Sequence, residues 1–299
     1  MTAAAAETNR VKEGGEGVPL DSRAECRVCF RHCLIPEGGL GACRARTNEG
    51  GTVKCASYGI VTSLALDPIE KKPLRRFCPG SMILSAGGYG CNLRCPFCQN
   101  HEISMAGPAD FPGSRRISPG ELADAALSLS DRGNIGIAFT YNEPMIWYEY
   151  VRDTAKLVKA NGQKVVLVTN GTASKEVLLE ILPLIDAMNI DLKGFSGEYY
   201  RDFLGGDLEM TKEFIKMAAE SGHVEITTLA VPGKNDSVEE MRRLSGWIAS
   251  LPGGRSIPLH ISRYFPRYRL SEPATPVETV MKLCRTAREN LEYVYPGNC

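Results

Sequence analysis

The stretch "GYGCNLRCPFCQNHEIS", residues 88–104, places three cysteines in one short polar segment. Cys91, Cys95 and Cys98 follow one another with three and then two residues between them. Three thiolates can hold three corners of a cubic iron–sulfur cluster and leave the fourth iron open to another ligand. A structural zinc site needs four ligands, and a redox-active thiol pair needs only two. The spacing favours a [4Fe–4S] cluster, with a zinc site completed from elsewhere as the alternative.

The composition of the chain is that of a globular protein. Of its 299 residues, 43% are hydrophobic and 23% are charged, which is enough for one large core or for one core with a small appendage. Lys+Arg and Asp+Glu both number 35, so no net charge attracts nucleic acid or an anionic membrane. We find no apolar run with the length of a signal peptide or a membrane span. We therefore expect a cytoplasmic protein with neither a nucleic acid nor a membrane as its partner.

Short apolar runs alternate with longer amphipathic ones from residue 80 onward. Two amphipathic stretches begin with helix-capping sequences, Ser118 with Glu121 and Ser237 with Glu240. Strands that alternate with helices predict βαβ units and a parallel sheet. Six units are fewer than the eight of a closed barrel, so we expect an α/β fold, a partial (β/α)6 barrel, with a doubly wound sheet as the alternative. The predicted strands are residues 82–88, 135–140, 164–169, 185–192, 224–231 and 257–262.

Polar residues stand at the points where these predicted strands end. Parallel α/β sheets and barrels assemble their sites at this edge. Ordinary turn chemistry explains each polar group separately, but it does not explain why such groups follow every strand. The sequence therefore predicts one site at the carboxyl edge of the sheet. Its members are the three-cysteine segment, residues 140–144, 169–171, 191–194 and 232–236, and His260 with Arg263.

The cysteine spacing, with the aromatic Phe97 just before the last cysteine, resembles the signature of radical S-adenosylmethionine (SAM) enzymes. The resemblance implies that a [4Fe–4S] cluster on the three cysteines chelates the amino and carboxylate groups of SAM. It also implies that one electron cleaves the sulfonium to give methionine and a 5′-deoxyadenosyl radical, which abstracts a hydrogen atom. An enzyme of this kind is a radical SAM oxidoreductase and needs a one-electron donor similar to flavodoxin or ferredoxin.

Longer segments resemble the radical SAM component of the AmmeMemoRadiSam group, a relative of pyruvate formate-lyase activating enzyme. The resemblance covers almost the whole chain and is nearly silent about the substrate. The activating enzymes imply a glycyl-radical protein as substrate, whereas a small molecule or RNA stays an alternative. A non-catalytic iron–sulfur or zinc protein for electron transfer or interaction is the alternative from another class. The matching segments are "LDPIEKKPLRRFCPGSMILSAGGYGCNLRCPFCQNHEIS" (66–104), "TYNEP" (140–144), "DLKG" (191–194) and "PLHISRYFPRY" (258–268).

The resemblance also implies which residues lie at the cofactor. Glu143 stands where the family contacts the ammonium group of SAM, because a carboxylate forms a charge-assisted hydrogen bond there. The activating-enzyme branch commonly has an acidic residue of a monovalent-cation site where this chain has Val168, so that site stays open. A histidine such as His260 is as often structural as it is functional. The cofactor-binding residues that the resemblance implies are Phe97, Asn142, Glu143, Asn170, Asp191, Lys193 and His260.

A second group of cysteines precedes the first predicted strand. Four thiolates in a glycine-rich segment too short for its own core predict a small metal-stapled module. Structural zinc is favoured, and a second [4Fe–4S] cluster is the alternative. These four cysteines are Cys26, Cys29, Cys33 and Cys43. The expected organisation is a disordered tail over residues 1–20, a Cys-rich module over residues 21–77 and a radical SAM barrel over residues 78–299.

Overall fold

The computed structural model describes residues 22–299, so the tail predicted at residues 1–20 lies outside the described residues. An eight-stranded sheet forms the centre of the fold, with the strand order β12-β11-β10-β9-β8-β7-β6-β5. The six predicted strands are confirmed as adjacent parallel strands of this sheet. They are β6 (Met82–Gly87), β7 (Asn134–Phe139), β8 (Lys164–Thr169), β9 (Ala187–Asp191), β10 (His223–Ala230) and β11 (Leu259–Arg263).

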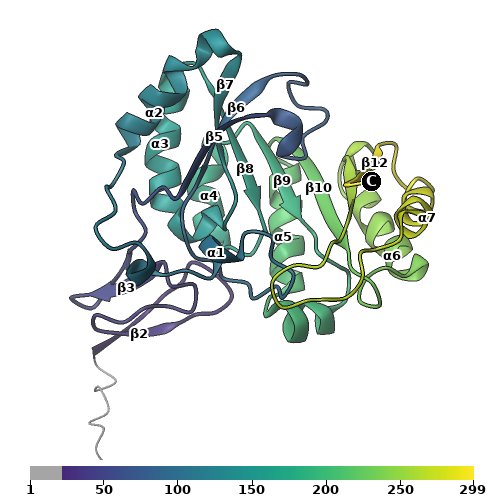
Figure 1. Ribbon diagram of the computed structural model, residues 1–299, viewed down its shortest axis with the longest axis horizontal. Coiled ribbons are helices and arrows are strands. Elements are labelled where there is room, and N and C mark those ends of the chain that lie inside the picture. The colour runs from purple at the N-terminus through teal and green to yellow at the C-terminus, as the bar shows by residue number, and fades with distance from the viewer. Residues whose placement is uncertain (1–21) are drawn as a thin grey trace, which may run out of the picture.

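Two strands that the sequence analysis did not predict extend the sheet at its edges. Strand β12 (Val294–Gly297) pairs parallel with β11, and β5 (Ser63–Pro68) pairs antiparallel with β6. The β5 strand lies within the range predicted for the Cys-rich module. In the structure it belongs to the central sheet, which is therefore mostly rather than wholly parallel (Figure 1).

Helices follow the strands as the predicted βαβ pattern requires. The capping box predicted at Ser118 is confirmed, since its side chain accepts from the Glu121 N–H at 3.2 Å and the Glu121 carboxylate accepts from the Ser118 N–H at 2.7 Å. Ser237 also caps its helix, but the Glu240 carboxylate accepts from the Phe195 N–H at 2.6 Å. The α-helices are α1 (His101–Ser104), α2 (Pro119–Ser128), α3 (Tyr148–Ala160), α4 (Lys175–Ile181), α5 (Leu208–Ala219), α6 (Val238–Ala249) and α7 (Val277–Ala287). Shorter turns are η2 (Ile69–Lys71), η3 (Pro108–Asp110), η4 (Ser130–Arg132), η5 (Pro144–Trp147), η6 (Leu182–Leu184), η8 (Gly254–Ser256) and the π-helical η7 (Tyr199–Leu204).

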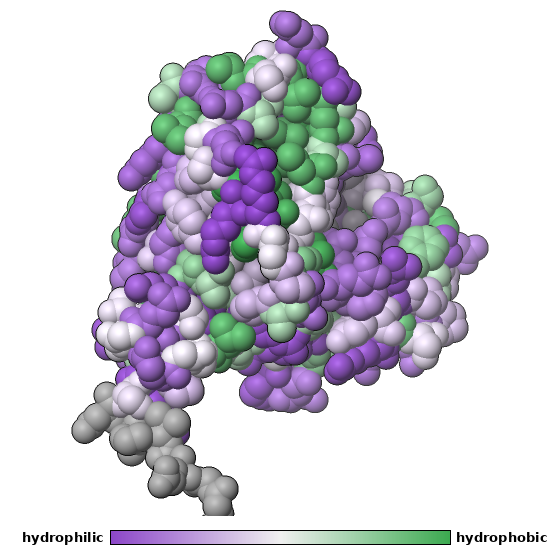
Figure 2. All heavy atoms as spheres, turned by 60° about the vertical axis from the view of Figure 1, so that its left-hand side comes forward, coloured by the Kyte–Doolittle hydropathy of each residue, from purple (hydrophilic) through white to green (hydrophobic). Residues whose placement is uncertain are grey.

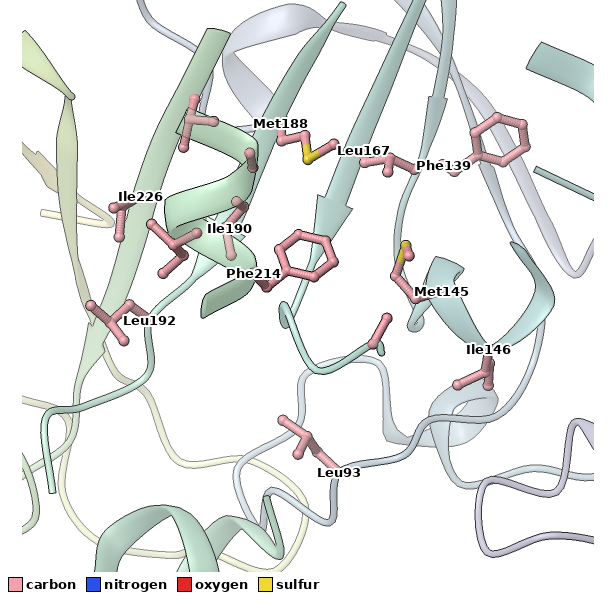
Figure 3. Packing of buried hydrophobic residues seen from close by; sticks show 14 of the residues in the cluster. Leu93, Phe139, Met145, Ile146, Leu167, Met188, Ile190, Leu192, Phe214 and Ile226 are labelled. Carbon is pink, nitrogen blue, oxygen red and sulfur yellow. The ribbon is translucent and has the colours of Figure 1, made fainter. Parts of the chain in front are cut away.

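The outer face of the sheet is apolar and packs against these helices. Leu167, Ile190 and Ile226 come from three neighbouring strands and belong to one buried apolar cluster with Phe214 of α5 (Figure 3). All four side chains are at most 2% exposed. Because successive side chains of a strand point to opposite faces, the residues between them must point to the inner face.

The inner face of the sheet is covered by residues 69–77, which we call the plug segment. Ile69 and Leu74 of this segment are fully buried. They form an apolar cluster with small and branched side chains from four adjacent strands. These partners are Ile83, Ala138, Val166 and Ala187.

Polar side chains of the inner face fasten the plug segment. The Asn189 amide donates to the Pro73 carbonyl at 2.9 Å. The Glu225 carboxylate accepts from the backbone N–H groups of Arg75 and Arg76, at 3.0 and 2.7 Å. Buried carboxylates need such donors, because an unpaired buried charge is costly. The plug segment is therefore held by hydrogen bonds as well as by apolar packing.

The N-terminal residues form two small antiparallel sheets near the carboxyl edge of the central sheet (Figure 1). The module packs on the three-cysteine segment. Gly90 there has a φ of +84°, and a side chain on it would collide with the Cys43 carbonyl oxygen. Arg31 donates to the Asn92 carbonyl at 2.6 Å. The four strands are β1 (Arg23–Glu25), β2 (Leu34–Pro36), β3 (Arg46–Glu49) and β4 (Thr52–Cys55).

The surface of the protein carries both hydrophilic and hydrophobic residues. Figure 2 shows hydrophilic residues over most of one face, with hydrophobic residues gathered mainly toward its upper end. Within residues 22–299, none of the helices combines the length and the apolar character that a membrane crossing requires.

Candidate functional site

The three-cysteine loop, residues 88–104, begins where β6 ends and includes the short helix α1 at its end. Asn142, which follows β7, clamps the start of this loop. Its side-chain oxygen accepts from the Gly88 N–H at 2.9 Å, and its amide donates to the Gly90 carbonyl at 3.1 Å. The side chain of Asn142, which the resemblance places at SAM, thus fixes the loop backbone in this structure.

Of the three thiols of the loop, that of Cys95 is buried, and those of Cys91 and Cys98 are half-buried. Burial raises the pKa of Cys95 to about 11, while the nearby Lys193 ammonium opposes that rise. The Asn170 amide lies 3.7 Å from the Cys91 sulfur. Cys91, Cys95 and Cys98 are all free thiols and interact electrostatically with one another. A cation and an amide donor stabilise thiolate sulfur, so the donor chemistry of this loop fits the three ligands of an iron–sulfur cluster.

Lys193 and Asp191 form an ion pair at the end of β9, with 2.8 Å between the ammonium nitrogen and the carboxylate. Burial lowers the pKa of Lys193, but the Asp191 carboxylate and the Cys95 thiol outweigh it, and the net shift is upward. The Asn235 amide donates to the Lys193 carbonyl at 2.6 Å and holds the turn. A permanent positive charge therefore lies beside the cysteine loop.

Glu143 connects the loops that follow β7 and β8. It is 2% exposed, and its carboxylate accepts from the Thr169 hydroxyl at 2.7 Å, the Asn170 N–H at 2.8 Å and the Met145 N–H at 3.0 Å. Burial raises the pKa of Glu143 to about 7 despite these hydrogen bonds. The contact with the SAM ammonium stays a prediction, whereas the bridge between the two loops is a feature of the structure.

His260 is held by an acidic residue that sequence analysis missed. Its Nε2 lies 2.6 Å from a carboxylate oxygen of Glu225, whose other oxygen lies 2.9 Å from Nε2 of His223. Burial raises the pKa of Glu225, but the hydrogen bonds from both histidines and from the plug backbone prevail and hold it at about 2. A charged residue within the apolar run 224–231 was the one sequence feature that pointed to this position.

Two adjoining cavities open at this edge of the sheet. The larger has a volume of about 750 Å³ and lies between the plug segment and the strand ends. The smaller has a volume of about 540 Å³, and the two share Gln99 and Asn298 in their walls. The larger cavity is lined by Asp67, Lys72, Arg75, Asn100, Tyr141 and His260, among others. The smaller is lined by Phe97, Leu229, Arg263, Tyr264, Phe265 and Arg267, among others.

The predicted site residues thus divide into two groups. Phe97 and His260 line cavities. The others do not line either of these two cavities. They form hydrogen bonds that hold the loops, or they lie beside the thiols. These others are Asn142, Glu143, Asn170, Asp191 and Lys193.

The segment 263–270 packs on the three-cysteine loop. The Arg269 N–H donates to the Pro96 carbonyl at 2.8 Å. Tyr268 stacks on His101 with 4.5 Å between ring centroids. These contacts join the end of β11 to the beginning of the first βα unit.

The four N-terminal cysteines also lie in one region. Cys26, Cys29 and Cys33 interact electrostatically, and burial raises the pKa of Cys43 to about 12. The Cys26 N–H donates to the Cys33 carbonyl at 2.8 Å. Among residues 22–299, however, no group of three or more His, Cys, Asp or Glu side chains is arranged so that it could hold a metal ion, and this is true of Cys91, Cys95 and Cys98 as well as of the four N-terminal cysteines.

The fold and the site together define an α/β protein whose candidate site lies at the carboxyl edge of its sheet. Residues 86–245 match the family described as the radical SAM superfamily. The chain is 41% identical over 281 residues to an uncharacterized protein of Methanocaldococcus jannaschii, covering 93% of this chain and 82% of that protein. The chain therefore belongs to the radical SAM superfamily, and membership implies a [4Fe–4S] cluster and SAM as cofactors.

More distant similarities agree with this assignment. Pyruvate formate-lyase 1-activating enzyme of Escherichia coli K12 is 26% identical over 176 residues, which are 57% of this chain and 70% of that enzyme. The crystal structure of Streptococcus suis SuiB bound to S-adenosylmethionine matches with a TM-score of 0.54 and 17% identity. That match covers 71% of this chain and 48% of SuiB and shows a shared fold.

Proposed function

We propose that the protein is an enzyme that reductively cleaves SAM at a [4Fe–4S] cluster held by Cys91, Cys95 and Cys98, and then abstracts a hydrogen atom. The observation that carries this proposal is the place of the three-cysteine loop, at the carboxyl edge of the sheet and next to two adjoining cavities. When bound, the cluster would supply a free iron coordination site for SAM and the electron for cleavage.

The residues of the chain would position SAM and exclude water. Phe97, Leu229 and Tyr264 give the smaller cavity an apolar wall suited to the adenosyl part of SAM. The Asp191–Lys193 pair and the bridging Glu143 carboxylate keep the loops around the cysteines in place. A closed, fixed environment matters because an organic radical must not react with solvent.

Two classes of hydrogen donor, a protein or peptide and a small molecule, are supported by different observations. Similarity to pyruvate formate-lyase activating enzymes supports a protein donor that acquires a glycyl radical. A SuiB structure bound to its precursor peptide is a further match and supports a peptide donor. The larger cavity supports a small molecule, because about 750 Å³ lies within the usual range of small-molecule sites, roughly 300–1,000 Å³.

Isotope transfer distinguishes these donors. Reconstituted enzyme is incubated with SAM, a chemical one-electron reductant and deuterium-labelled cell extract separated into protein, RNA and small-molecule fractions. We expect 5′-deoxyadenosine to form and to carry deuterium from one fraction. Label from the small-molecule fraction alone would reject glycyl-radical activation. If 5′-deoxyadenosine is not formed with any fraction, the proposed SAM chemistry is wrong.

The physiological electron would come from a flavodoxin-like or ferredoxin-like protein. The same assay tests this when such a protein, with its reductase, replaces the chemical reductant. We expect SAM cleavage to continue. Cleavage that occurs with the chemical reductant and stops with both protein donors would exclude this partner class.

We further propose that Cys26, Cys29, Cys33 and Cys43 hold structural zinc, and a second [4Fe–4S] cluster is the alternative. Four free cysteines that interact electrostatically support this proposal. Protein purified without added iron should then contain about one zinc per chain, and replacing all four cysteines with serine should remove it. Iron at roughly twice the content of one cluster, lost in the same variant, would favour the second cluster. Metal content that is unchanged by the substitutions would reject both.

A further inference from the structure

A buried lysine lies in the wall of the larger cavity. Lys72 is 3% exposed and follows the short turn η2 in the plug segment. Its ammonium nitrogen lies 2.9 Å from a carboxylate oxygen of Asp67 and 4.7 Å from the centre of the Tyr141 ring. All three residues line the cavity. Lysine is among the residues least often buried, so its place here calls for a reason.

The neighbours of Lys72 form a small acid–base cluster. The same Asp67 oxygen accepts from the Tyr141 hydroxyl at 2.8 Å, and the other accepts from Lys71 at 3.2 Å. Burial lowers the pKa of Lys72, and the ion pair with Asp67 compensates only in part. A buried lysine with a lowered pKa loses its proton more readily than an exposed one, and the neutral amine is a nucleophile toward carbonyl carbon.

Tyr141 is held in this cluster by the three-cysteine loop. Its φ of +73° is in the left-handed region, which is rarely occupied by aromatic residues. Its carbonyl accepts from the Asn100 amide at 2.7 Å. Strained backbone of this kind is typical of functional sites, where the surroundings enforce it. An ion pair that served only to attach the plug segment would not require this conformation of Tyr141.

The cavity also contains a cation that is free to meet an anionic ligand. Arg75 lines the cavity and is exposed, and its guanidinium lies 5.9 Å from the centre of the Tyr295 ring. Within residues 22–299 its side chain makes no ion pair. Guanidinium groups bind carboxylates through paired hydrogen bonds. The cavity therefore presents a buried lysine with a lowered pKa and a separate carboxylate-binding group.

We propose that Lys72 forms a reversible imine with a small aldehyde or ketone that carries a carboxylate, and so holds it for the radical chemistry of the neighbouring site. This inference rests on the small-molecule branch of the proposed function. The Lys72 nitrogen forms a bond to the carbonyl carbon, and the carbonyl oxygen leaves as water with two hydrogens from the ammonium group. Asp67 relays these protons from nitrogen to oxygen. The protonated imine keeps one positive charge, so the ion pair with Asp67 is preserved and no oxidant or reductant is required.

Reductive trapping tests the imine without SAM or a reduced cluster. The full-length protein is incubated with pyruvate or glyoxylate and sodium cyanoborohydride, and the modified residue is located by peptide mass spectrometry. We expect modification at Lys72 in preference to Lys71, its exposed neighbour, whose side chain is 67% exposed. Preference for the less accessible lysine would not arise from accessibility alone.

Variants make the assignment specific. Lys72→Arg keeps the positive charge but cannot form an imine, and it should lose the adduct, whereas Lys71→Arg should retain it. Tyr141→Phe keeps both lysines and should slow trapping. Modification spread over surface lysines, absence of modification at Lys72, or an undiminished adduct in Lys72→Arg would overturn the proposal. If a variant does not fold, locating the modified lysine in the wild-type protein still tests the proposal. Because trapping needs no SAM, its failure is distinct from a failure of the isotope-transfer experiment.

Discussion

Replacing Cys91, Cys95 and Cys98 together with alanine is expected to abolish both cluster binding and SAM cleavage. Three thiolates supply every protein bond to the proposed cluster, so the variant keeps no ligand at this loop. After anaerobic reconstitution, the variant should therefore lack the iron–sulfur absorbance that this loop gives the wild-type protein, and it should form no 5′-deoxyadenosine. Iron content, the visible spectrum and product formation measure the result.

Two variants make this result interpretable. Cys299 is exposed, and Cys299→Ala should leave the cluster and SAM cleavage unchanged. Glu143→Gln should keep the cluster but weaken SAM binding, because it removes a negative charge and no iron ligand. If the triple variant retained the wild-type cluster spectrum and SAM cleavage, these cysteines would not be the ligands. Unchanged SAM affinity in Glu143→Gln would exclude the predicted ammonium contact.

The central strands could be predicted because they are buried on both faces and read as continuous apolar runs. The edge strands lack that pattern. In β12, Pro296 and Gly297 are residues that disfavour strands, and proline is tolerated there because an edge strand leaves N–H groups unpaired. In β5, Leu64 is 47% exposed, so its segment did not resemble a core strand. Both misses have the same cause, since burial is what creates the sequence pattern.

The site was predicted in outline because parallel strands bring their carboxyl ends to one edge. The partners of each side chain could not be predicted. Asn142 and Asn170 match cofactor-binding segments, yet in the structure their amides contact Gly90 and Asn92 of the loop. Such contacts depend on how loops from different strands meet, and the pattern of apolar and polar residues along the sequence does not predict this.

Glu225 shows most clearly what the sequence could not reveal, because its backbone donors lie about 150 positions earlier in the chain. Its carboxylate is fully buried and fastens the plug segment as well as His223 and His260. These hydrogen bonds lower the pKa of Glu225 from 4.5 to about 2. The charged form is thus favoured by folding, so the stabilisation is present above about pH 4.5 and is lost as the pH falls toward 2.

Glu225→Gln is therefore expected to lower the free energy of unfolding at pH 7 by roughly 3 kcal/mol, at about 1.4 kcal/mol per pKa unit. An amide at this position retains one acceptor oxygen, whereas the carboxylate offers two, so a donor in the plug segment loses its partner. Urea unfolding of both proteins between pH 7 and pH 3 measures the difference, which should shrink below about pH 4.5, because there the Glu225 carboxylate of the unfolded wild-type chain becomes protonated while that of the folded protein stays charged. Glu209→Gln, at a residue with 78% side-chain exposure, is the control and should change stability by less than about 0.5 kcal/mol. A difference that stayed constant over this pH range would show that the charge of Glu225 does not hold the plug segment.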